Sequence, residues 1–113
     1  MGSPLTTHVL DTAHGVPASG IEVTLAVLRD GDWVHLGRYA TNADGRVPDM
    51  LAEGALTTGT WRLRFDVAEY FGRRQLRCFF PSAELVFEVT DLSRHHHVPL
   101  LVSPFSYSTY RGS

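Results

Sequence analysis

Short segments in which apolar and polar residues alternate dominate this sequence of 113 residues. In residues 61–67 an apolar residue stands at every second position, and residues 21–27 and 85–89 follow the same period. Successive side chains point to opposite faces of a strand, so a period of two predicts strands that are buried on one face. Clusters of Gly, Pro, Asn and Asp between the segments predict turns. Four further strands are expected, at residues 5–10, 33–41, 95–102 and 105–110.

One segment, residues 68–76, is expected to form a short helix of roughly two turns. Seven or eight short strands with one minor helix are typical of an antiparallel β-sandwich, so the expected fold class is all-β. A hydrophobic fraction of 43% and a charged fraction of 19% are those of an ordinary globular chain. We expect residues 5–113 to form one domain, and residues 1–4 to be a disordered start or a remnant of cloning.

The charge and the apolar runs exclude some classes of partner. Ten Lys and Arg against twelve Asp and Glu give a net charge of −2, so no basic surface for nucleic acid is expected. No apolar run approaches the ~20 residues of a membrane span, and no secretory leader opens the chain, so a cytoplasmic location is expected. Cys78, the single cysteine, is expected to be a small buried residue rather than a nucleophile.

Three consecutive histidines stand at positions 95–97. In a strand, His95 and His97 face one way, and His96 faces the core. Two histidines at this spacing can ligate a metal, but no third ligand stands at a telling spacing, so no metal is expected. Pro99 lacks an N–H donor, so we expect it at a sheet edge or a bulge, where pairing beside His97 is weakened.

His8 and Arg46 are isolated in the sequence. His8 is expected to share a strand face with Thr6 and Leu10, and Arg46 follows the turn formed by Asp44 and Gly45. Each is by itself more typical of a surface or a turn than of a catalytic site. The period of two does not bring these residues together, so on the residues alone the chain is a β-sandwich with scattered His and Arg.

Four blocks of the sequence do resemble one known family, the transthyretin-like proteins, at residues 10–18, 41–46, 95–104 and 105–113. The resemblance extends from Leu5 to Ser113 and is greatest to the branch that hydrolyses 5-hydroxyisourate. That branch is marked by residues that correspond here to His8, Arg46, His97 and the final Tyr110-Arg111-Gly112-Ser113. Its hormone-carrying relatives continue past this point with small apolar residues. The family usually has Tyr or a similar residue at position 96, which we expect to face the core.

The resemblance implies that the chain opens the six-membered ring of 5-hydroxyisourate in urate degradation, without a cofactor. The implied product is 2-oxo-4-hydroxy-4-carboxy-5-ureidoimidazoline. Catalytic roles fall on His8, Arg46, His97 and Ser113, and substrate binding on Arg46 and the segment from Tyr110 through Arg111 and Gly112 to Ser113. The resemblance also implies a homotetramer, built as a dimer of dimers, with the sites at the dimer–dimer interface.

Two alternatives stay open. One is a thyroid-hormone-like carrier that binds its ligand in the central channel that the resemblance implies between the dimers, without catalysing a reaction. The other is a metal-dependent hydrolase with His95, His97 and His8 as ligands. Which histidine is the general base also stays open, with a slight preference for His97 because it lies close to Pro99.

Overall fold

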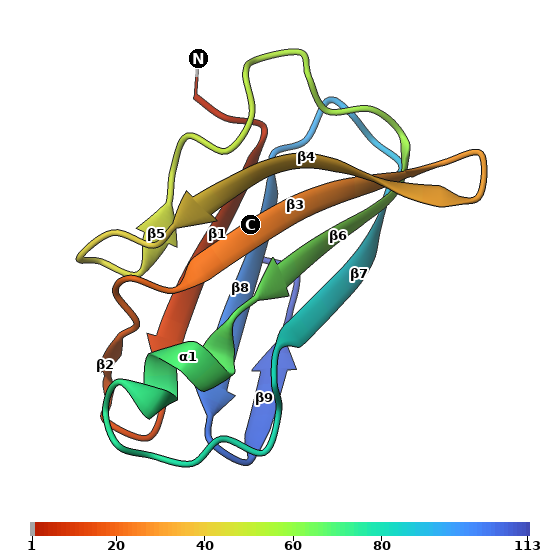
Figure 1. The fold of residues 1–113 in the computed structure, drawn as a ribbon. Helices are drawn as coiled ribbons and strands as arrows, with labels where there is room; N and C mark the ends of the chain where they lie inside the picture. The colour runs from red at the N-terminus through yellow and green to blue at the C-terminus, as the bar shows by residue number, and fades with distance from the viewer. Residues whose placement is uncertain (1) are drawn as a thin grey trace.

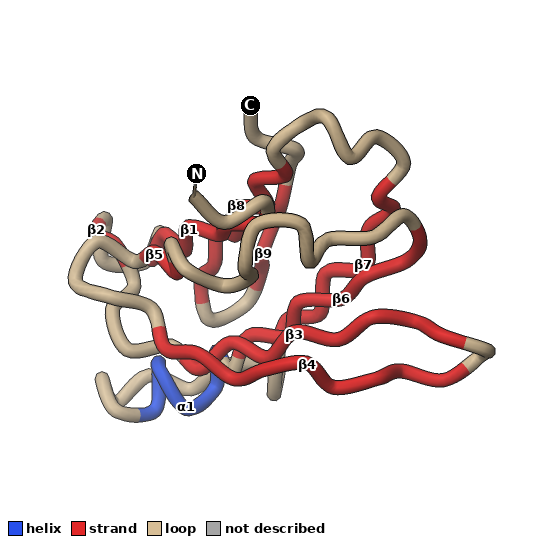
Figure 2. Tube along the Cα trace, turned by 90° about the horizontal axis from the view of Figure 1, so that it is seen from above, coloured by secondary structure: helices blue, strands red, loops and turns tan. Residues whose placement is uncertain are grey.

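Two stacked β-sheets make up most of the computed structural model, which describes residues 2–113 (Figure 1). In chain order the elements are β1 (Leu5–Asp11), β2 (Val16–Pro17), β3 (Glu22–Arg29), β4 (Asp32–Ala40), β5 (Arg46–Val47), β6 (Gly59–Phe65), α1 (Val67–Gly72), β7 (Ala83–Val89), β8 (His96–Ser103) and β9 (Ser106–Thr109). One sheet has the order β2-β1-β8-β9, with β5 also paired to β1, and the other has the order β4-β3-β6-β7. Figure 2 shows the two layers from above, with both chain ends on the side of β1 and β8.

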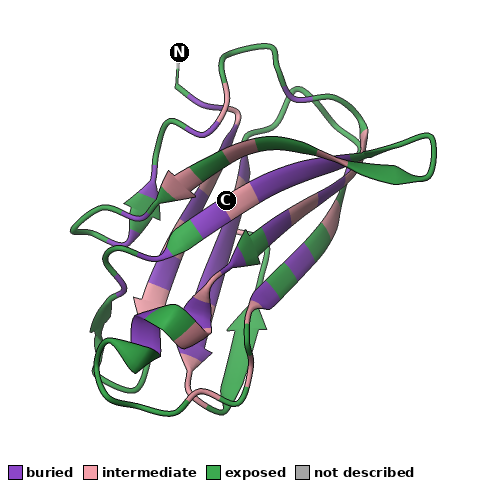
Figure 3. Ribbon diagram, in the orientation of Figure 1, coloured by how far each residue is buried: buried purple, intermediate pink, exposed green. Residues whose placement is uncertain are grey.

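The core lies between the layers and is filled by every second residue of the strands. In β6, the side chains of Trp61, Leu63 and Phe65 are fully buried, whereas Arg64 is exposed. Figure 3 shows the same alternation as stripes along β7. Each such side chain contributes about 1.5–3 kcal/mol by leaving water. The expected all-β sandwich with one short helix is confirmed.

The strand pairing differs from the expected antiparallel pattern in one place, because β1 and β8 are parallel. These strands are far apart in the chain, so no hairpin forces them to run in opposite directions. The pair is reinforced across the strands by the Thr7 hydroxyl, which donates a 2.6 Å hydrogen bond to the carbonyl of Val98. Strands β2 and β5 were not expected, since two residues are too few to show a period of two.

The helix is shorter than the expected segment 68–76 and ends at Gly72. The chain has left the helical conformation by Gln75, whose φ is 61°. The helix still provides core residues, since Tyr70 and Phe71 are fully buried. Within residues 2–113, no helix is both long and apolar enough to cross a membrane.

Two of our expectations concern the chain start and Cys78. Met1 lies outside the described residues, and the expectation of a disordered segment 1–4 stays a prediction. Ser3 nevertheless has defined contacts, since its side chain oxygen accepts a 3.0 Å hydrogen bond from the backbone N–H of Leu51. Cys78 is half-buried and packs against the core rather than being fully enclosed.

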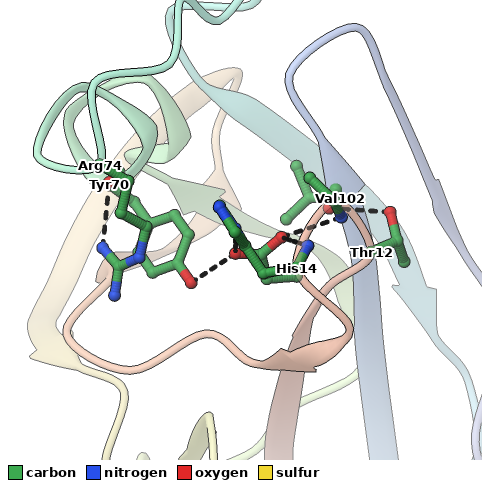
Figure 4. A network of polar contacts seen from close by, with 7 residues as sticks. Thr12, His14, Tyr70, Arg74 and Val102 are labelled. Atoms are coloured by element: carbon green, nitrogen blue, oxygen red, sulfur yellow. Dashed lines mark hydrogen bonds and ion pairs between the residues drawn. The ribbon is translucent and has the colours of Figure 1, made fainter.

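A buried carboxylate joins the end of β1 to the helix. The side chain of Asp11 is 0% exposed and accepts hydrogen bonds from the Tyr70 hydroxyl at 2.7 Å and from Nδ1 of His14 at 2.6 Å (Figure 4). Burial raises the pKa of this carboxyl, but the hydrogen bonds from Tyr70 and His14 outweigh burial, and the pKa lies below its ordinary value. Burial and the bond to Asp11 raise the pKa of Tyr70 to about 12. Asp11 is therefore ionised and fully bonded at neutral pH.

Replacing Tyr70 with Phe is expected to lower the free energy of unfolding by about 1–3 kcal/mol at pH 7, because a buried carboxylate loses a donor. The folded-state pKa of Asp11 is depressed, so the network stabilises the protein above the unfolded pKa and loses this effect as the pH falls through the folded value. The cost of Tyr70→Phe should therefore shrink below about pH 4. Thermal denaturation at a fixed protein concentration measures both effects.

Tyr39→Phe is a matched control, because it removes a 2.7 Å hydrogen bond to the neutral carbonyl of Met50. We expect Tyr39→Phe to lower the free energy of unfolding by a smaller amount, about 0.5–1.5 kcal/mol, and this cost should not change at acid pH. Equal costs for Tyr70→Phe and Tyr39→Phe at every pH would contradict the role given to Asp11.

Candidate active site

Strand register brings three of the expected site residues onto one face of the β1 sheet. His8 lies directly opposite Arg46 of β5, and on its other side it pairs with Pro99 of β8. Thr6, two residues earlier in β1, pairs with His97. Directly opposite residues point to the same face of a sheet. Thr7 and Val9 point to the core, so Thr6, His8, Arg46 and His97 share the outer face.

The turn before β5 fixes the position of Arg46. The side-chain oxygen of Asn42 accepts hydrogen bonds from the backbone N–H groups of Asp44 at 2.9 Å and Arg46 at 3.0 Å. Gly45 has a φ of 75°, and a Cβ there would collide with the carbonyl of Val9. The Arg46 side chain is exposed, and within residues 2–113 it forms no ion pair. Its guanidinium is therefore free to bind an anion.

The same turn sets the tautomer of His8. Nε2 of His8 lies 2.9 Å from the carbonyl oxygen of Asp44. A carbonyl can only accept, so Nε2 carries a proton, and in the neutral ring the lone pair is on Nδ1. His8 thus presents an acceptor nitrogen on a ring held by the backbone.

His97 is half-buried beside two groups that disfavour its charged form. Burial lowers the pKa of His97, and Arg46 and His8 lower it further, so the ring is neutral at neutral pH. Nδ1 of His97 lies 2.9 Å from the Thr6 hydroxyl. Among the residues that the structure describes, none forms a hydrogen bond with Nε2. A neutral imidazole with a free nitrogen can accept a proton from water.

The last residues pack against His97. The backbone N–H of Gly112 donates a 2.8 Å hydrogen bond to the carbonyl of His97, and the two residues form an isolated bridge. A Cβ at position 112 would lie 2.5 Å from Cδ2 of the His97 ring. Position 112 therefore needs Gly, because any larger residue would displace the ring or the final segment.

Pro99 explains how the final segment leaves β8. The β8–β9 pairing runs from Ser103 to Leu100 and resumes only at His97. Pro99 has no N–H to donate, and its carbonyl accepts a 2.7 Å hydrogen bond from the Thr109 side chain instead. Pro99 was expected at an edge or a bulge; β8 is not an edge strand, since it lies between β1 and β9, but Pro99 stands where the pairing with β9 is interrupted. The expected weakening of the pairing beside His97 is observed.

The other expected residues of the final segment are less tightly placed. Tyr110 is 59% exposed, and Arg111 and Ser113 are also exposed. Tyr110 and Arg111 line a cavity of about 360 Å³ between β7 and β8 that also touches His96 and His97. His96 faces the core as expected and is 4% exposed. Burial and then Arg111 lower the pKa of His96, which keeps this ring neutral as well.

Sequence reasoning missed two contributors to the site. The Thr6 hydroxyl lies between His97 and His95, at 2.8 Å from Nε2 of His95. The carbonyl of Asp44 orients His8. The spacing of Thr6 and His8 placed both on one face, but their partners depend on the register between β1 and β8. Within residues 2–113, no three His, Cys, Asp or Glu side chains gather at a site that could hold a metal.

Comparison with known proteins identifies the family of the chain. The family model described as HIUase/Transthyretin matches residues 5–112, nearly the whole chain. The chain belongs to this family. The resemblance seen in the sequence is confirmed, and so is the sandwich fold.

Both branches of the HIUase/Transthyretin family are represented among the similar proteins. The 5-hydroxyisourate hydrolase of Mus musculus is 47% identical over 113 residues, which cover 98% of this chain and 96% of the mouse protein. The structure of Klebsiella pneumoniae 5-hydroxyisourate hydrolase has a TM-score of 0.81 and 34% identity, covering 96% of this chain and 92% of that one. Sea bream transthyretin, crystallised with thyroxine, has a TM-score of 0.92 and 30% identity, covering 97% and 95%.

The backbone fold does not separate the hydrolase branch from the carrier branch. The carrier has the higher TM-score, whereas the mouse hydrolase has the higher sequence identity. Within such a family, function depends on the side chains at the site rather than on the fold.

Proposed function

We propose that this chain is a hydrolase that opens the six-membered ring of 5-hydroxyisourate in urate degradation, giving 2-oxo-4-hydroxy-4-carboxy-5-ureidoimidazoline. The observation that carries the proposal is the shared outer face of His8, Arg46 and His97, which combines two imidazoles with an unpaired guanidinium. The names of the mouse and Klebsiella relatives supply the substrate.

The proposed chemistry uses each group according to its charge and free atoms. Hydrolysis of an acyl C–N bond needs an activated water, a stabilised oxyanion and an oriented substrate. Nε2 of His97 takes a proton from water as the water oxygen attacks the ring carbonyl, and Nδ1 of His8 accepts a hydrogen bond from the O–H that remains on that oxygen. Arg46 binds the developing oxyanion. The C–N bond then breaks, and the proton on His97 passes to the leaving nitrogen.

The last residues are proposed to close one side of this site. Gly112 is held against the His97 ring. Its neighbours Tyr110, Arg111 and Ser113 are therefore kept close to the proposed base. Their exposure in a single chain leaves their polar groups available to substrate. We propose substrate binding for Tyr110, Arg111 and Gly112, and binding with a catalytic contribution from the hydroxyl of Ser113.

The sheet that contains β1 and β8 carries the candidate site and is called the site sheet. Its outer face is also proposed to pack against other copies of the chain. Leu10 and Leu101 pair with each other and are only half-buried, on the same face as His8 and His97. Apolar side chains beside a polar site are typical of an interface that completes the site. We propose a homotetramer, a dimer of dimers with sites at the dimer–dimer interface, and light scattering measures its mass. A cytoplasmic location and a lack of nucleic-acid partners stay predictions.

To test the proposed function, 5-hydroxyisourate is generated in the assay with urate oxidase, and its ultraviolet absorbance is followed. The purified protein should accelerate the decay well above the spontaneous rate, and chelation of metals should leave the rate unchanged. Decay at the spontaneous rate would refute the proposal. Loss of activity on chelation would favour the metal-dependent alternative.

The similarity to sea bream transthyretin supports a second candidate, a carrier of thyroid-hormone-like molecules. A carrier would bind such a ligand without turnover and would tolerate replacement of His8 and His97. Calorimetric titration with thyroxine, alongside the hydrolysis assay, distinguishes the two functions.

Replacing Gly112 with Ala is expected to lower kcat for 5-hydroxyisourate by about tenfold to a hundredfold, since a small misplacement of a catalytic group has this effect. The new Cβ would lie 2.5 Å from the His97 ring, so the ring or the final segment must shift. Gly72→Ala is the matched control, because nothing lies within 4 Å of a Cβ at that position. Equal kcat values for both variants would show that the contact with His97 is unimportant.

A further inference from the structure

One hydroxyl joins two histidines on the outer face of the site sheet. Oγ1 of Thr6 lies 2.9 Å from Nδ1 of His97 and 2.8 Å from Nε2 of His95. Thr6 is held in β1, where it pairs with His97, and its backbone neighbours Leu5 and Thr7 are buried. Both distances are those of good hydrogen bonds, so the three side chains form a continuous chain.

A threonine hydroxyl has a single proton, so it can donate to only one of the two rings. If it donates to His97, then Nδ1 of His97 holds the lone pair, and the proton of the neutral ring is on Nε2. If it donates to His95, then Nδ1 of His97 holds the proton and donates it to Oγ1. In that second arrangement the lone pair of His97 is on Nε2, the nitrogen without a partner among the described residues.

We propose that Thr6 and His95 are positioning residues that hold His97 in the tautomer with its lone pair on Nε2. His95 accepts the Thr6 proton, Thr6 accepts the Nδ1 proton of His97, and Nε2 is left as the base. The inference rests on the proposed function, because a general base in that reaction needs this lone pair. Thr6 and His95 exchange no proton with substrate.

The surroundings of His97 favour the neutral ring that this arrangement needs. Arg46 on β5, His8 on β1 and His95, which directly precedes β8, lie near the ring, and Arg111 lies next to Gly112 in the final segment. Burial and the nearby Arg46 both favour a neutral ring over a charged one. The tautomer, rather than the charge, is then what Thr6 decides, as a hydrogen bond to one ring nitrogen selects the state of the other.

The test compares Thr6→Val with Thr6→Ser. Val has the shape of Thr and suits a strand but has no hydroxyl, whereas Ser keeps the hydroxyl. We expect Thr6→Val to lower kcat by about tenfold to a hundredfold, the usual effect of losing a group that orients a histidine. KM should change little, because Thr6 does not contact substrate. Thr6→Ser should recover most of kcat.

A spectroscopic measurement on the free protein makes the test independent of activity. Long-range ¹H–¹⁵N correlation spectra of histidine-labelled protein report which ring nitrogen holds the proton. In the wild type and in Thr6→Ser, we expect the proton of His97 on Nδ1. In Thr6→Val, a mixture of both tautomers is expected, and His95→Ala should move the same signals in the same direction.

An unchanged His97 tautomer and an unchanged kcat in Thr6→Val would overturn the inference. So would a wild-type spectrum with the proton on Nε2. A wild-type protein that does not hydrolyse 5-hydroxyisourate would contradict the proposed function instead, and the spectra would still decide whether Thr6 places the proton.

Discussion

Replacing His97 with Gln is expected to lower kcat for 5-hydroxyisourate by about 10²–10⁴-fold, the usual contribution of a general base. Gln retains a polar side chain of similar reach, but it cannot take a proton. Stopped-flow or rapid-mixing absorbance measurements, with urate oxidase supplying the substrate, give kcat and KM separately. KM should change much less than kcat, because the lost interaction forms as the water is deprotonated.

The pH profile of the wild type adds a second check. Burial, Arg46 and His8 lower the pKa of His97 from its ordinary value of 6.5. The ring therefore stays neutral at pH values somewhat below 6.5. A base is active when it is unprotonated, so kcat/KM should be level at neutral pH and should fall only when the pH drops below about 6.5. In His97→Gln this acid limb should disappear.

His35→Gln is the matched control, since His35 is an exposed histidine on β4 of the other sheet. Its kcat should equal that of the wild type. Wild-type kcat in His97→Gln would remove His97 from the mechanism and would leave His8 as the candidate base.

Replacing Arg46 with Ala is expected to lower kcat/KM by about 10²–10³-fold, because the transition state loses its cationic partner. The guanidinium has no competing ion pair among the described residues, so its charge is available to the substrate. The same substitution should raise the pKa of His97, since Arg46 lowers it through its positive charge. The acid limb of kcat/KM should therefore shift to higher pH, which a pH series on the variant measures.

Arg38→Ala is the control for the loss of an exposed arginine. Arg38 lies on β4 and its side chain is 67% exposed beside Glu22. Activity and the acid limb should be unchanged. A shift of the acid limb without loss of activity in Arg46→Ala would show that Arg46 affects the base but does not bind the substrate.

Strands β1, β3, β6, β7 and β8 could be predicted from the sequence because their buried residues recur with a period of two. Strand β6 is the plainest case, with Trp61, Leu63 and Phe65 on the buried face. Strands β4 and β9 were also expected, although neither has a fully buried residue. The parallel pairing of β1 and β8 could not be predicted, because side-chain period does not reveal which strands are neighbours. The two-residue strands β2 and β5 were missed for lack of any period.

The candidate site was predicted by the resemblance rather than by the pattern. His8, Arg46 and His97 matched a family motif, and the register of β1 with β5 and β8 then places them on one face. Their roles, and that of Ser113, stay predictions. Thr6 was placed on this face by its spacing, but its two hydrogen bonds depend on the exact pairing of β1 with β8. The contact of the Asp44 carbonyl with His8 could not be predicted, because a backbone carbonyl is the same in every residue type.

The parallel pairing of β1 with β8 has a consequence for how the molecule is made. Strand β1 leaves the ribosome well before β8 and must wait for β8 before the two can join. Closing so long a loop is slow. Until the loop closes, the edge of β1 that pairs with β8 has no partner strand. A nascent chain that lacks β8 can hold neither His97 nor its contact with Thr6. Activity should therefore appear only after translation has passed Ser103, and this late step is where chaperones would help most.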